Sequence, residues 1–379
     1  MKNILFIIGT RPEAIKMAPL IKEFFKYPSL FNTKVCVTGQ HKQMLDQVLN
    51  FFGIVPDYNL NLMQPNQTLF DLTALALKAL EGVLENTKPD ILFVQGDTTT
   101  AFVGSLAGYY KKIKVAHIEA GLRSGNKYSP FPEEGNRILC GHLADYHFAP
   151  TIQAKNNLAK EGILENVEVV GNTVIDALFL GLSLIKENDE FYYEYFKAVD
   201  FTKKIILVTA HRRESFGKPF EEICGAIKEI ATQFKDVEVV YPVHLNPNVQ
   251  EPVQKLLSGI NNVHLIPPLD YSFLIWLMNK SYLVLTDSGG IQEEAPALGI
   301  PVLVMREVTE RMEGVLAGTA KLVGTSKEMI WEETAKLLTD NLEYAQMAKA
   351  VNPYGDGQTS KKVLNYIMSD LNIKVLTKA

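Results

Sequence analysis

The first segment of this chain suited to chemistry is DSGGIQEEAPALG at 287–299, which follows a strand-like run and opens an expected helix. Ser288, Gly289 and Gly290 would leave backbone N–H groups uncovered at the helix start, where anions bind, a diphosphate in particular. Glu294 follows within about one turn, where a carboxylate could reach a ribose diol. The alternative is an N-capped helix whose glycines serve only the turn. Neither a P-loop lysine nor a Gly-x-Gly-x-x-Gly run accompanies it.

Three carboxylates stand where strands end or helices begin. Asp97 lies in GDTTT, Glu119 ends the apolar run of HIEAGLRS, and Glu133 opens a helix in FPEEGNR. Each has a simpler explanation, since Asp97 could cap a helix and Glu133 could merely favour the helix dipole. His117 with Glu119 makes a weak metal site, because alternate strand residues point to opposite faces. Their convergence in one half of the chain favours general acid–base chemistry.

Cationic side chains follow other strands. Arg11 and Lys16 belong to GTRPEAIK, where they either face an anionic ligand or decorate a helix surface. His211 and Arg212 stand together in AHRRES, and a histidine beside arginines at a strand end favours a phosphate or a substrate contact. Later segments add His244, Arg306 and Arg311.

These residues must be positioned by strands and helices in alternation. Near-continuous apolar runs, which are typical of parallel strands covered on both faces, occur at 3–9, 34–39, 91–96, 114–120, 146–150 and 167–171, and again at 205–210, 237–243, 263–267, 282–287, 301–305 and 320–324. Helical patterns between them include 12–26, 68–87, 219–235 and 326–340. The alternation predicts the α/β class with doubly wound parallel sheets.

The two series of strands predict two Rossmann-like domains. We expect the first to comprise residues 1–170 with a crossover helix at 359–379, and the second to comprise residues 171–358. Ligands of such sheets bind at the carboxyl ends of the strands. Both sets of loops would therefore line one central cleft.

Composition narrows the function further. The chain has 379 residues, a formal net charge of −5 and a pI of about 5.9, so it has no basic footprint for nucleic acid or an anionic membrane. Its three cysteines are far apart, which argues against a disulfide framework. No apolar run reaches the roughly 18 residues of a membrane helix, and the N-terminal run is too short for a signal peptide. We therefore expect a cytoplasmic protein.

The motifs together resemble one enzyme family. In chain order they are GTRPEAIKMAPL, VTGQHKQMLDQVL, GDTTT, HIEAGLRS, PEEGNR, GNTVIDAL, HRRESFG, YPVHLNPNV, LTDSGGIQEEAPALG and NPYGDG. This series, from about residue 3 to 358, is similar to the non-hydrolysing bacterial UDP-N-acetylglucosamine 2-epimerases. The resemblance implies a glycosyltransferase-B-like fold, a homodimer, and no metal or redox cofactor. It also implies interconversion of UDP-GlcNAc and UDP-ManNAc for surface polysaccharide precursors.

Family roles transfer onto matching positions. The resemblance assigns essential carboxylates to Asp97, Glu119 and Glu133, a catalytic histidine to His211, nucleotide contacts to Ser288, Gly289, Gly290 and Glu294, and further active-site positions to Arg11, Lys16 and Arg311. Three alternatives stay open: a hydrolysing epimerase that releases ManNAc, a glycosyltransferase of the same fold, and a non-catalytic UDP-sugar sensor.

Some members of that family bind a second UDP-GlcNAc as an activator. The matching positions are Gln40, Gln43, Gln67, Glu133, Arg212 and His244. Asn66 departs from the pattern, because those members have arginine there. A guanidinium makes charge-assisted contacts to phosphate that asparagine cannot replace.

Overall fold

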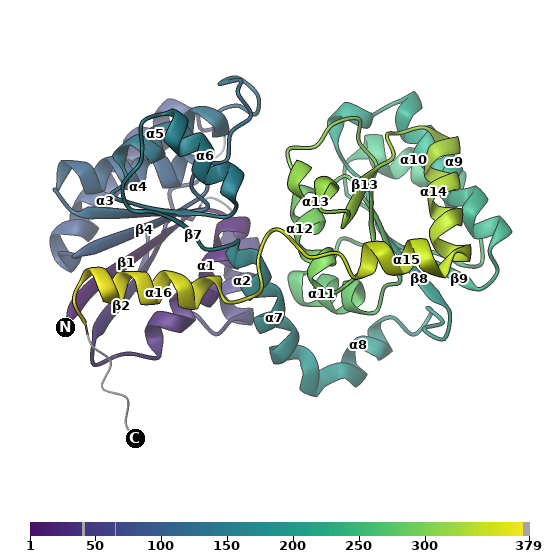
Figure 1. Ribbon diagram of the computed structural model, residues 1–379, viewed down its shortest axis with the longest axis horizontal. Helices are drawn as coiled ribbons and strands as arrows, with labels where there is room; N and C mark the ends of the chain where they lie inside the picture. Colours follow the sequence, from purple (N-terminus) through teal and green to yellow (C-terminus); the bar gives the residue numbers. More distant parts are fainter. Residues whose placement is uncertain (40–41, 65, 374–379) are drawn as a thin grey trace. The chain divides into compact units, whose positions relative to one another are not determined.

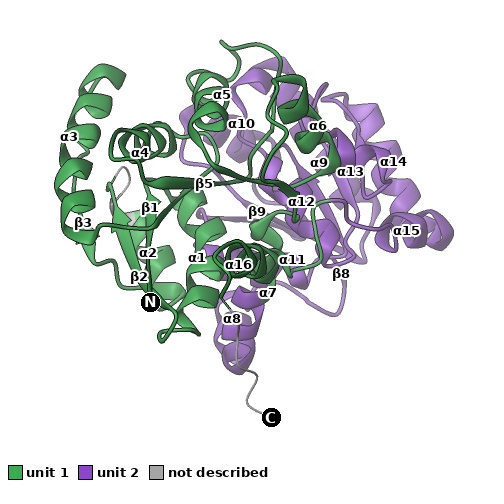
Figure 2. Cartoon of the chain, turned by 60° about the vertical axis from the view of Figure 1, so that its left-hand side comes forward, with its two compact units in different colours: residues 1–179, 354–379 green, residues 180–353 purple. Residues whose placement is uncertain are grey.

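The computed structural model describes residues 1–39, 42–64 and 66–373. It divides into two compact units, shown in Figure 2: unit 1 is residues 1–179 with the stretch from 354, and unit 2 is residues 180–353. Both are α/β, with one parallel sheet each, as the sequence predicts.

Unit 1 is built on a seven-stranded sheet in the order β3-β2-β1-β4-β5-β6-β7. The strands are β1 Lys2–Ile8, β2 Phe31–Val37, β3 Tyr58–Asn59, β4 Ile91–Gln95, β5 Lys114–Ile118, β6 Tyr146–Ala149 and β7 Val167–Val169. The helices are α1 Arg11–Phe25, α2 Lys42–Phe51, α3 Leu69–Thr87, α4 Thr99–Tyr110, α5 Glu133–Leu143, α6 Ile152–Lys160, α7 Thr173–Ile185, which runs on into unit 2, and α16 Thr359–Asp370. Helices α3, α4 and α5 cover one face of the sheet, and α1 with α16 covers the other (Figure 1).

Unit 2 is built on a six-stranded sheet in the order β10-β9-β8-β11-β12-β13. The strands are β8 Lys204–Thr209, β9 Val237–Pro242, β10 Val263–Ile266, β11 Leu283–Thr286, β12 Val302–Val304 and β13 Ala320–Leu322. The helices are α8 Asp189–Tyr195, α9 Lys218–Gln233, α10 Pro247–Leu257, α11 Tyr271–Asn279, α12 Gly289–Ala297, α13 Met312–Leu316, α14 Lys327–Thr339 and α15 Asn341–Ala348, with 3-10 turns at Lys186–Asn188 and Arg213–Ser215.

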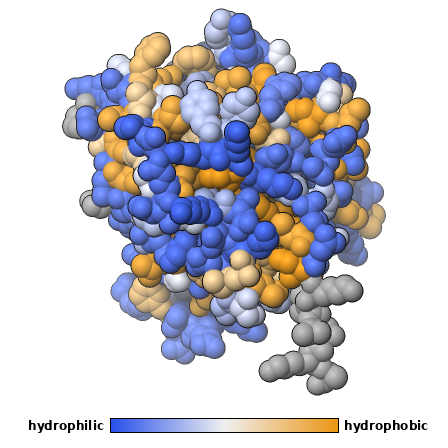
Figure 3. Space-filling view, turned by 90° about the vertical axis from the view of Figure 1, so that its left-hand side faces the viewer, coloured by the Kyte–Doolittle hydropathy of each residue, from blue (hydrophilic) through white to orange (hydrophobic). Residues whose placement is uncertain are grey.

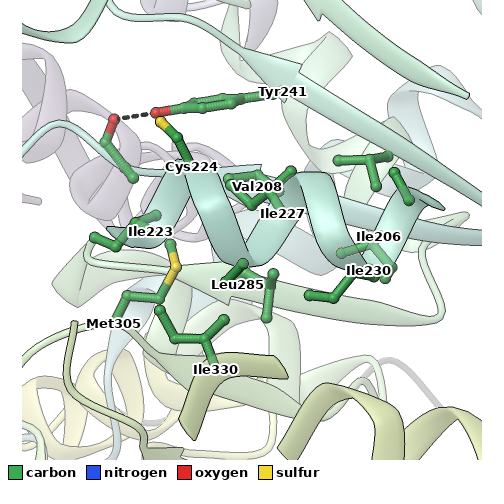
Figure 4. Packing of buried hydrophobic residues seen from close by; sticks show 14 of the residues in the cluster. Ile206, Val208, Ile223, Cys224, Ile227, Ile230, Tyr241, Leu285, Met305 and Ile330 are labelled. Atoms are coloured by element: carbon green, nitrogen blue, oxygen red, sulfur yellow. Dashed lines mark hydrogen bonds between the residues drawn. The ribbon is translucent and has the colours of Figure 1, made fainter. Parts of the chain in front are cut away.

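Every expected strand is present, and β3 is an additional short one. The central strands β1, β4 and β11 are buried along most or all of their length, which explains their continuous apolar sequences. In unit 2 the core packs α9 residues such as Ile223 and Ile227 against Val208 and Leu285 of the sheet (Figure 4). In unit 1, Phe6 and Phe93 stack with ring centroids 4.7 Å apart.

The unit boundaries differ from the expected ones at 170/171 and 358/359. The structure divides at 179/180 and 353/354, so the first half of α7 belongs to unit 1. The reason is a set of contacts between chain segments far apart in sequence. The Asp176 carboxylate in α7 accepts hydrogen bonds from the backbone N–H groups of Thr359, at 3.2 Å, and of Ser360, at 2.7 Å.

Candidate active site

Glu119 lies directly after β5, buried at 7% exposure. Its carboxylate accepts hydrogen bonds from Lys16 Nζ at 2.6 and 2.7 Å, from Asn172 Nδ2 at 3.1 Å and from Gln95 Nε2. Its backbone φ is +64°, in the left-handed region that costs a non-glycine residue about 1–2 kcal/mol. Strained residues of this kind concentrate at functional sites.

Asp97 follows β4 on the neighbouring strand and is paired with a cation. Its carboxylate forms an ion pair with Arg137, and its carbonyl accepts from Asn136 Nδ2 at 2.9 Å. Asp97 is not the cap of α4, because Thr98 takes that role and accepts from Ala101 N at 3.0 Å. The simpler explanation, that Asp97 caps this helix, is therefore wrong.

Glu133 and Glu134 are the first two residues of α5, and their carboxylates have different surroundings. Glu134 is 1% exposed and accepts from the backbone N–H groups of Ser124, at 2.9 Å, and Gly125, at 3.1 Å, so it fixes the preceding loop. Glu133 Oε2 is buried and has no hydrogen-bond partner among the described residues. A buried, unsatisfied carboxylate oxygen is costly, which favours a role for Glu133 toward a ligand.

Helix α1 carries two of the predicted cations and one carboxylate that sequence reasoning missed. Arg11 is its first residue and is partly exposed, whereas Lys16 is held by Glu119. Between them Glu13 is 1% exposed and accepts from Thr10 N at 2.7 Å and from Thr98 Oγ1 at 2.9 Å. Glu13 therefore ties the loop before Arg11 to the loop that carries Asp97.

The start of α12 has an N-cap residue without a capping side chain, followed by two glycines. Ser288 is the N-cap residue, but its side chain makes no capping hydrogen bond. Its own N–H donates to Thr286 Oγ1 at 2.9 Å. Gly289 and Gly290 form the first two residues of the helix. The macrodipole and these donors together favour an anion at this point.

Two glutamates follow on α12. Glu294 lies in the second turn, 6% exposed, and accepts from the Tyr271 hydroxyl at 3.0 Å. Glu293 forms an ion pair with Arg311, which places the Arg311 guanidinium beside the helix start. An ideal Cβ on Gly289 would lie 3.9 Å from the Arg311 guanidinium carbon. The predicted residues Ser288, Gly289, Gly290, Glu294 and Arg311 are therefore brought together within unit 2.

His211 lies in the loop after β8, beside the start of α12. Its ring stacks on His244, with centroids 5.3 Å apart and planes at 11°, and its Nδ1 lies 3.4 Å from Asp287 Oδ1. Burial lowers the pKa of His211, Asp287 raises it, and His244 and Arg212 lower it. Arg212 and His244 of the expected activator set are thus close to His211.

The rest of the activator set is described only in part. Gln40 lies outside the described residues, and only the backbone of Gln43 is described, within α2. Gln67 Nε2 donates to Leu62 O at 3.0 Å, within its own loop. Nothing in these contacts tests the activator site.

His117 has a structural role in the sheet of unit 1. It is fully buried, its Nε2 lies 2.7 Å from Gly96 O, and burial lowers its pKa to about 4.

Within the described part of the chain, no group of three or more metal-ligating side chains is arranged to hold a metal ion, and no helix is long and apolar enough to cross a membrane.

Comparisons with known proteins identify the family of this chain. The family model described as UDP-N-acetylglucosamine 2-epimerase matches residues 25–368. The UDP-N-acetylglucosamine 2-epimerase of Escherichia coli K12 is 54% identical over 372 residues, covering 97% of this chain and 99% of that protein. That of Campylobacter jejuni is 53% identical over 379 residues, covering 98% and 99%.

A solved structure extends the likeness to three dimensions. The UDP-GlcNAc 2-epimerase of Neisseria meningitidis, crystallised bound to UDP-GlcNAc, is 49% identical with a TM-score of 0.89, covering 97% of this chain and 100% of that chain. Sequence and fold are thus shared over nearly the whole length of both proteins. The chain belongs to the UDP-N-acetylglucosamine 2-epimerase family.

Proposed function

We propose that this chain interconverts UDP-GlcNAc and UDP-ManNAc, with the nucleotide held by unit 2 and the proton transfers performed by unit 1. The observation that carries the proposal is the buried Glu119 carboxylate, which Lys16 holds on a strained backbone after β5, next to the strand that precedes Asp97. A protein that only bound a UDP-sugar would not need these carboxylates. Relatives at 53–54% identity carry the name of this activity.

The reaction is an elimination followed by an addition. The C2 proton of the sugar has no neighbouring carbonyl to acidify it, so its removal must be coupled to departure of UDP from C1. That step gives 2-acetamidoglucal and UDP, with the C2–H electrons forming the C1–C2 double bond. Re-addition of UDP at C1, with protonation of C2 from the opposite face, gives the epimer.

Carboxylates perform the proton transfers, and cationic groups stabilise the leaving diphosphate. Asp97, Glu119 and Glu133 serve as the base and acid, each contributing about 10²–10⁴-fold. Arg11, His211 and the N–H groups of Gly289 and Gly290 stabilise the departing diphosphate. Glu294 accepts from the ribose hydroxyls, and the product supplies precursors of surface polysaccharides.

One reaction mixture tests the proposal. Enzyme and UDP-GlcNAc alone, followed by NMR in D₂O, should yield UDP-ManNAc with deuterium at C2 and, on long incubation, traces of free 2-acetamidoglucal. Free ManNAc as the main product would indicate the hydrolysing reaction instead. An unchanged substrate would favour a transferase or a sensor, and an epimer that keeps its C2 hydrogen would exclude the elimination.

We propose that this enzyme does not require UDP-GlcNAc as an activator. Asn66 stands where, by the family resemblance, the activated members have an arginine that could contact phosphate. UDP-ManNAc should therefore react without added UDP-GlcNAc, with hyperbolic kinetics. A lag or a sigmoidal curve abolished by traces of UDP-GlcNAc would contradict this.

A homodimer formed through α3 and α4 fits the surface of unit 1. Phe70 is 87% exposed, Tyr109 61% and Tyr110 62%, and a groove of about 530 Å³ between the helices is lined by Leu77 and Tyr110 among others. Figure 3 shows apolar patches among hydrophilic residues on one face of the molecule. Analytical ultracentrifugation should give a dimer that Phe70→Glu dissociates; a monomeric wild-type protein would refute the assignment.

A further inference from the structure

Asp287 is a buried carboxylate that the reaction above does not use. It follows β11 directly and is 1% exposed. Its Oδ2 accepts from the backbone N–H groups of His211, at 2.6 Å, and of Arg212, at 2.7 Å. Its Oδ1 is buried, has no hydrogen-bond partner among the described residues, and lies 3.4 Å from His211 Nδ1.

The backbone around His211 is fixed on both sides. The Tyr241 hydroxyl donates to the carbonyl of Ala210 at 2.7 Å, the contact drawn in Figure 4. Asp287 holds the two N–H groups that follow. The imidazole can therefore move only by rotation of its own side chain, and Asp287 Oδ1 faces one of its two nitrogens.

Other charged and titratable groups surround the ring. His244, from the loop after β9, stacks on it and accepts from Asn246 N at 3.1 Å through Nδ1, so a neutral His244 keeps its proton on Nε2. Arg212 comes from the same loop as His211. Both groups, like burial, disfavour a charged His211, and Asp287 alone among these neighbours favours it.

We propose that Asp287 is a positioning residue that keeps a proton on His211 Nδ1 and thereby leaves Nε2 for the diphosphate of the substrate. The proposal rests on the proposed function. A carboxylate can only accept, so the nitrogen that faces it must donate. The imidazolium form, which Asp287 stabilises, then donates from Nε2 to a phosphate oxygen as UDP departs.

Asp287→Asn separates this role from a purely structural one. The asparagine carbonyl oxygen can still accept from both backbone N–H groups, which preserves the loop. Its amide nitrogen faces His211 Nδ1 and donates, which reverses the tautomer. We expect kcat to fall by about 10²-fold or more, with the KM for UDP-GlcNAc changed only a few-fold. The basic limb of the kcat–pH profile should move to lower pH, because Asp287 favours the charged imidazole and asparagine does not.

A double-mutant cycle and a matched control sharpen the test. In a His211→Ala background, Asp287→Asn should cost nothing further in kcat if it acts through the imidazole. Glu238 offers the control, because it is 4% exposed, pairs with His264 Nε2 at 2.5 Å, and stands at the opposite end of the same sheet. Glu238→Gln should keep the wild-type kcat and pH profile.

Imidazole ¹⁵N NMR supplies a readout that is independent of turnover. The wild-type His211 should show a proton on Nδ1 in its neutral form, and Asp287→Asn should move it to Nε2. An unchanged tautomer and pH titration in a folded Asp287→Asn protein would overturn the proposal. If the tautomer reverses but the wild-type enzyme forms no UDP-ManNAc, the positioning role stands and the proposed function fails.

Discussion

Glu119 combines a strained backbone with a proposed role in proton transfer. Its φ of +64° suits glycine, yet glutamate occupies the position and binds Lys16. We expect Glu119→Gln to fold and to lose about 10²–10⁴-fold in turnover, because the amide cannot exchange a proton at C2. Since the nucleotide is assigned to unit 2, UDP affinity measured by calorimetry should stay within a few-fold of wild type.

The control for that variant is Asp90→Asn. Asp90 also pairs with a lysine, Lys2, and accepts from Asn3 N at 2.8 Å, but it lies at the amino end of β4. The turnover of the Asp90→Asn variant should match that of the wild-type enzyme. Equal losses in both variants would mean that the effect at Glu119 is general instability.

Glu13 predicts a pH-dependent stability. Burial raises its pKa from 4.5 to about 7, against the hydrogen bonds from Thr10, Thr98 and Gly9, which lower it. Between pH 4.5 and 7 the folded protein therefore keeps a proton that the unfolded chain has lost. The free energy of unfolding of unit 1 should fall across this range by about 3 kcal/mol from this group.

The Glu13→Gln variant tests this predicted pH dependence of the free energy of unfolding. The variant should lose this part of the pH dependence, so its stability relative to wild type should rise from pH 5 to pH 8. Hydrogen exchange of β1 and β4 amides under increasing urea reports on unit 1 directly. Parallel profiles for the two proteins across this pH range would contradict the assignment.

The sequence indicated the residues that end strands but not the residues that hold them. Asp97, Glu119 and His211 each follow an apolar run, so their place at the carboxyl edge was predictable. Asn172, which binds Glu119, and Asp287, which binds the His211 loop, act across 53 and 76 residues of sequence. No local pattern encodes such pairs, although Gln95 at the end of apolar β4 was a signal that could have been read.

At the scale of elements, α12 provides a direct test of nucleotide binding. An ideal Cβ on Gly290 would meet only Glu294 Oε2, at 3.6 Å, an ordinary contact. Gly290→Val should therefore fold, yet its branched side chain would block a phosphate from the helix N–H groups. We expect calorimetry to show UDP binding weakened by at least about tenfold. Gly82→Val in α3 of unit 1, where no atom of the chain lies within 4 Å of an added Cβ, should leave UDP binding unchanged.

The elements themselves were largely predictable because parallel strands covered on both faces are continuous apolar runs. β3 was not, since a two-residue strand at the sheet edge has no such run. The extent of α7 in unit 1 was also missed, because Asp176 caps a helix that lies 183 residues away along the chain. Local sequence determines where helices and strands form, whereas long-range polar contacts determine where one unit ends and the next begins.

At the scale of the molecule, α16 completes unit 1 from the far end of the chain. Besides the Asp176 contacts, the Tyr146 hydroxyl donates to Asp370 Oδ2 at 2.6 Å. Asp176→Ala removes the acceptor of two buried N–H groups, at a cost of about 1–3 kcal/mol. Hydrogen exchange should then accelerate in α16 while β8 and β11 of unit 2 stay protected. Uniform acceleration in both units would show that α16 is not a local element.

The return of α16 has a consequence for how the protein is made. The ribosome finishes residues 1–179 before unit 2, but the buried residues Val363, Leu364 and Ile367 of α16, which belong to unit 1, are synthesised after unit 2. At about 5–20 residues per second the stretch from 180 to 370 takes roughly 10–40 s. During that interval unit 2, which is continuous in sequence, can fold first. The apolar surface that α16 will cover is exposed during that interval, so unit 1 is completed only after unit 2 has been synthesised.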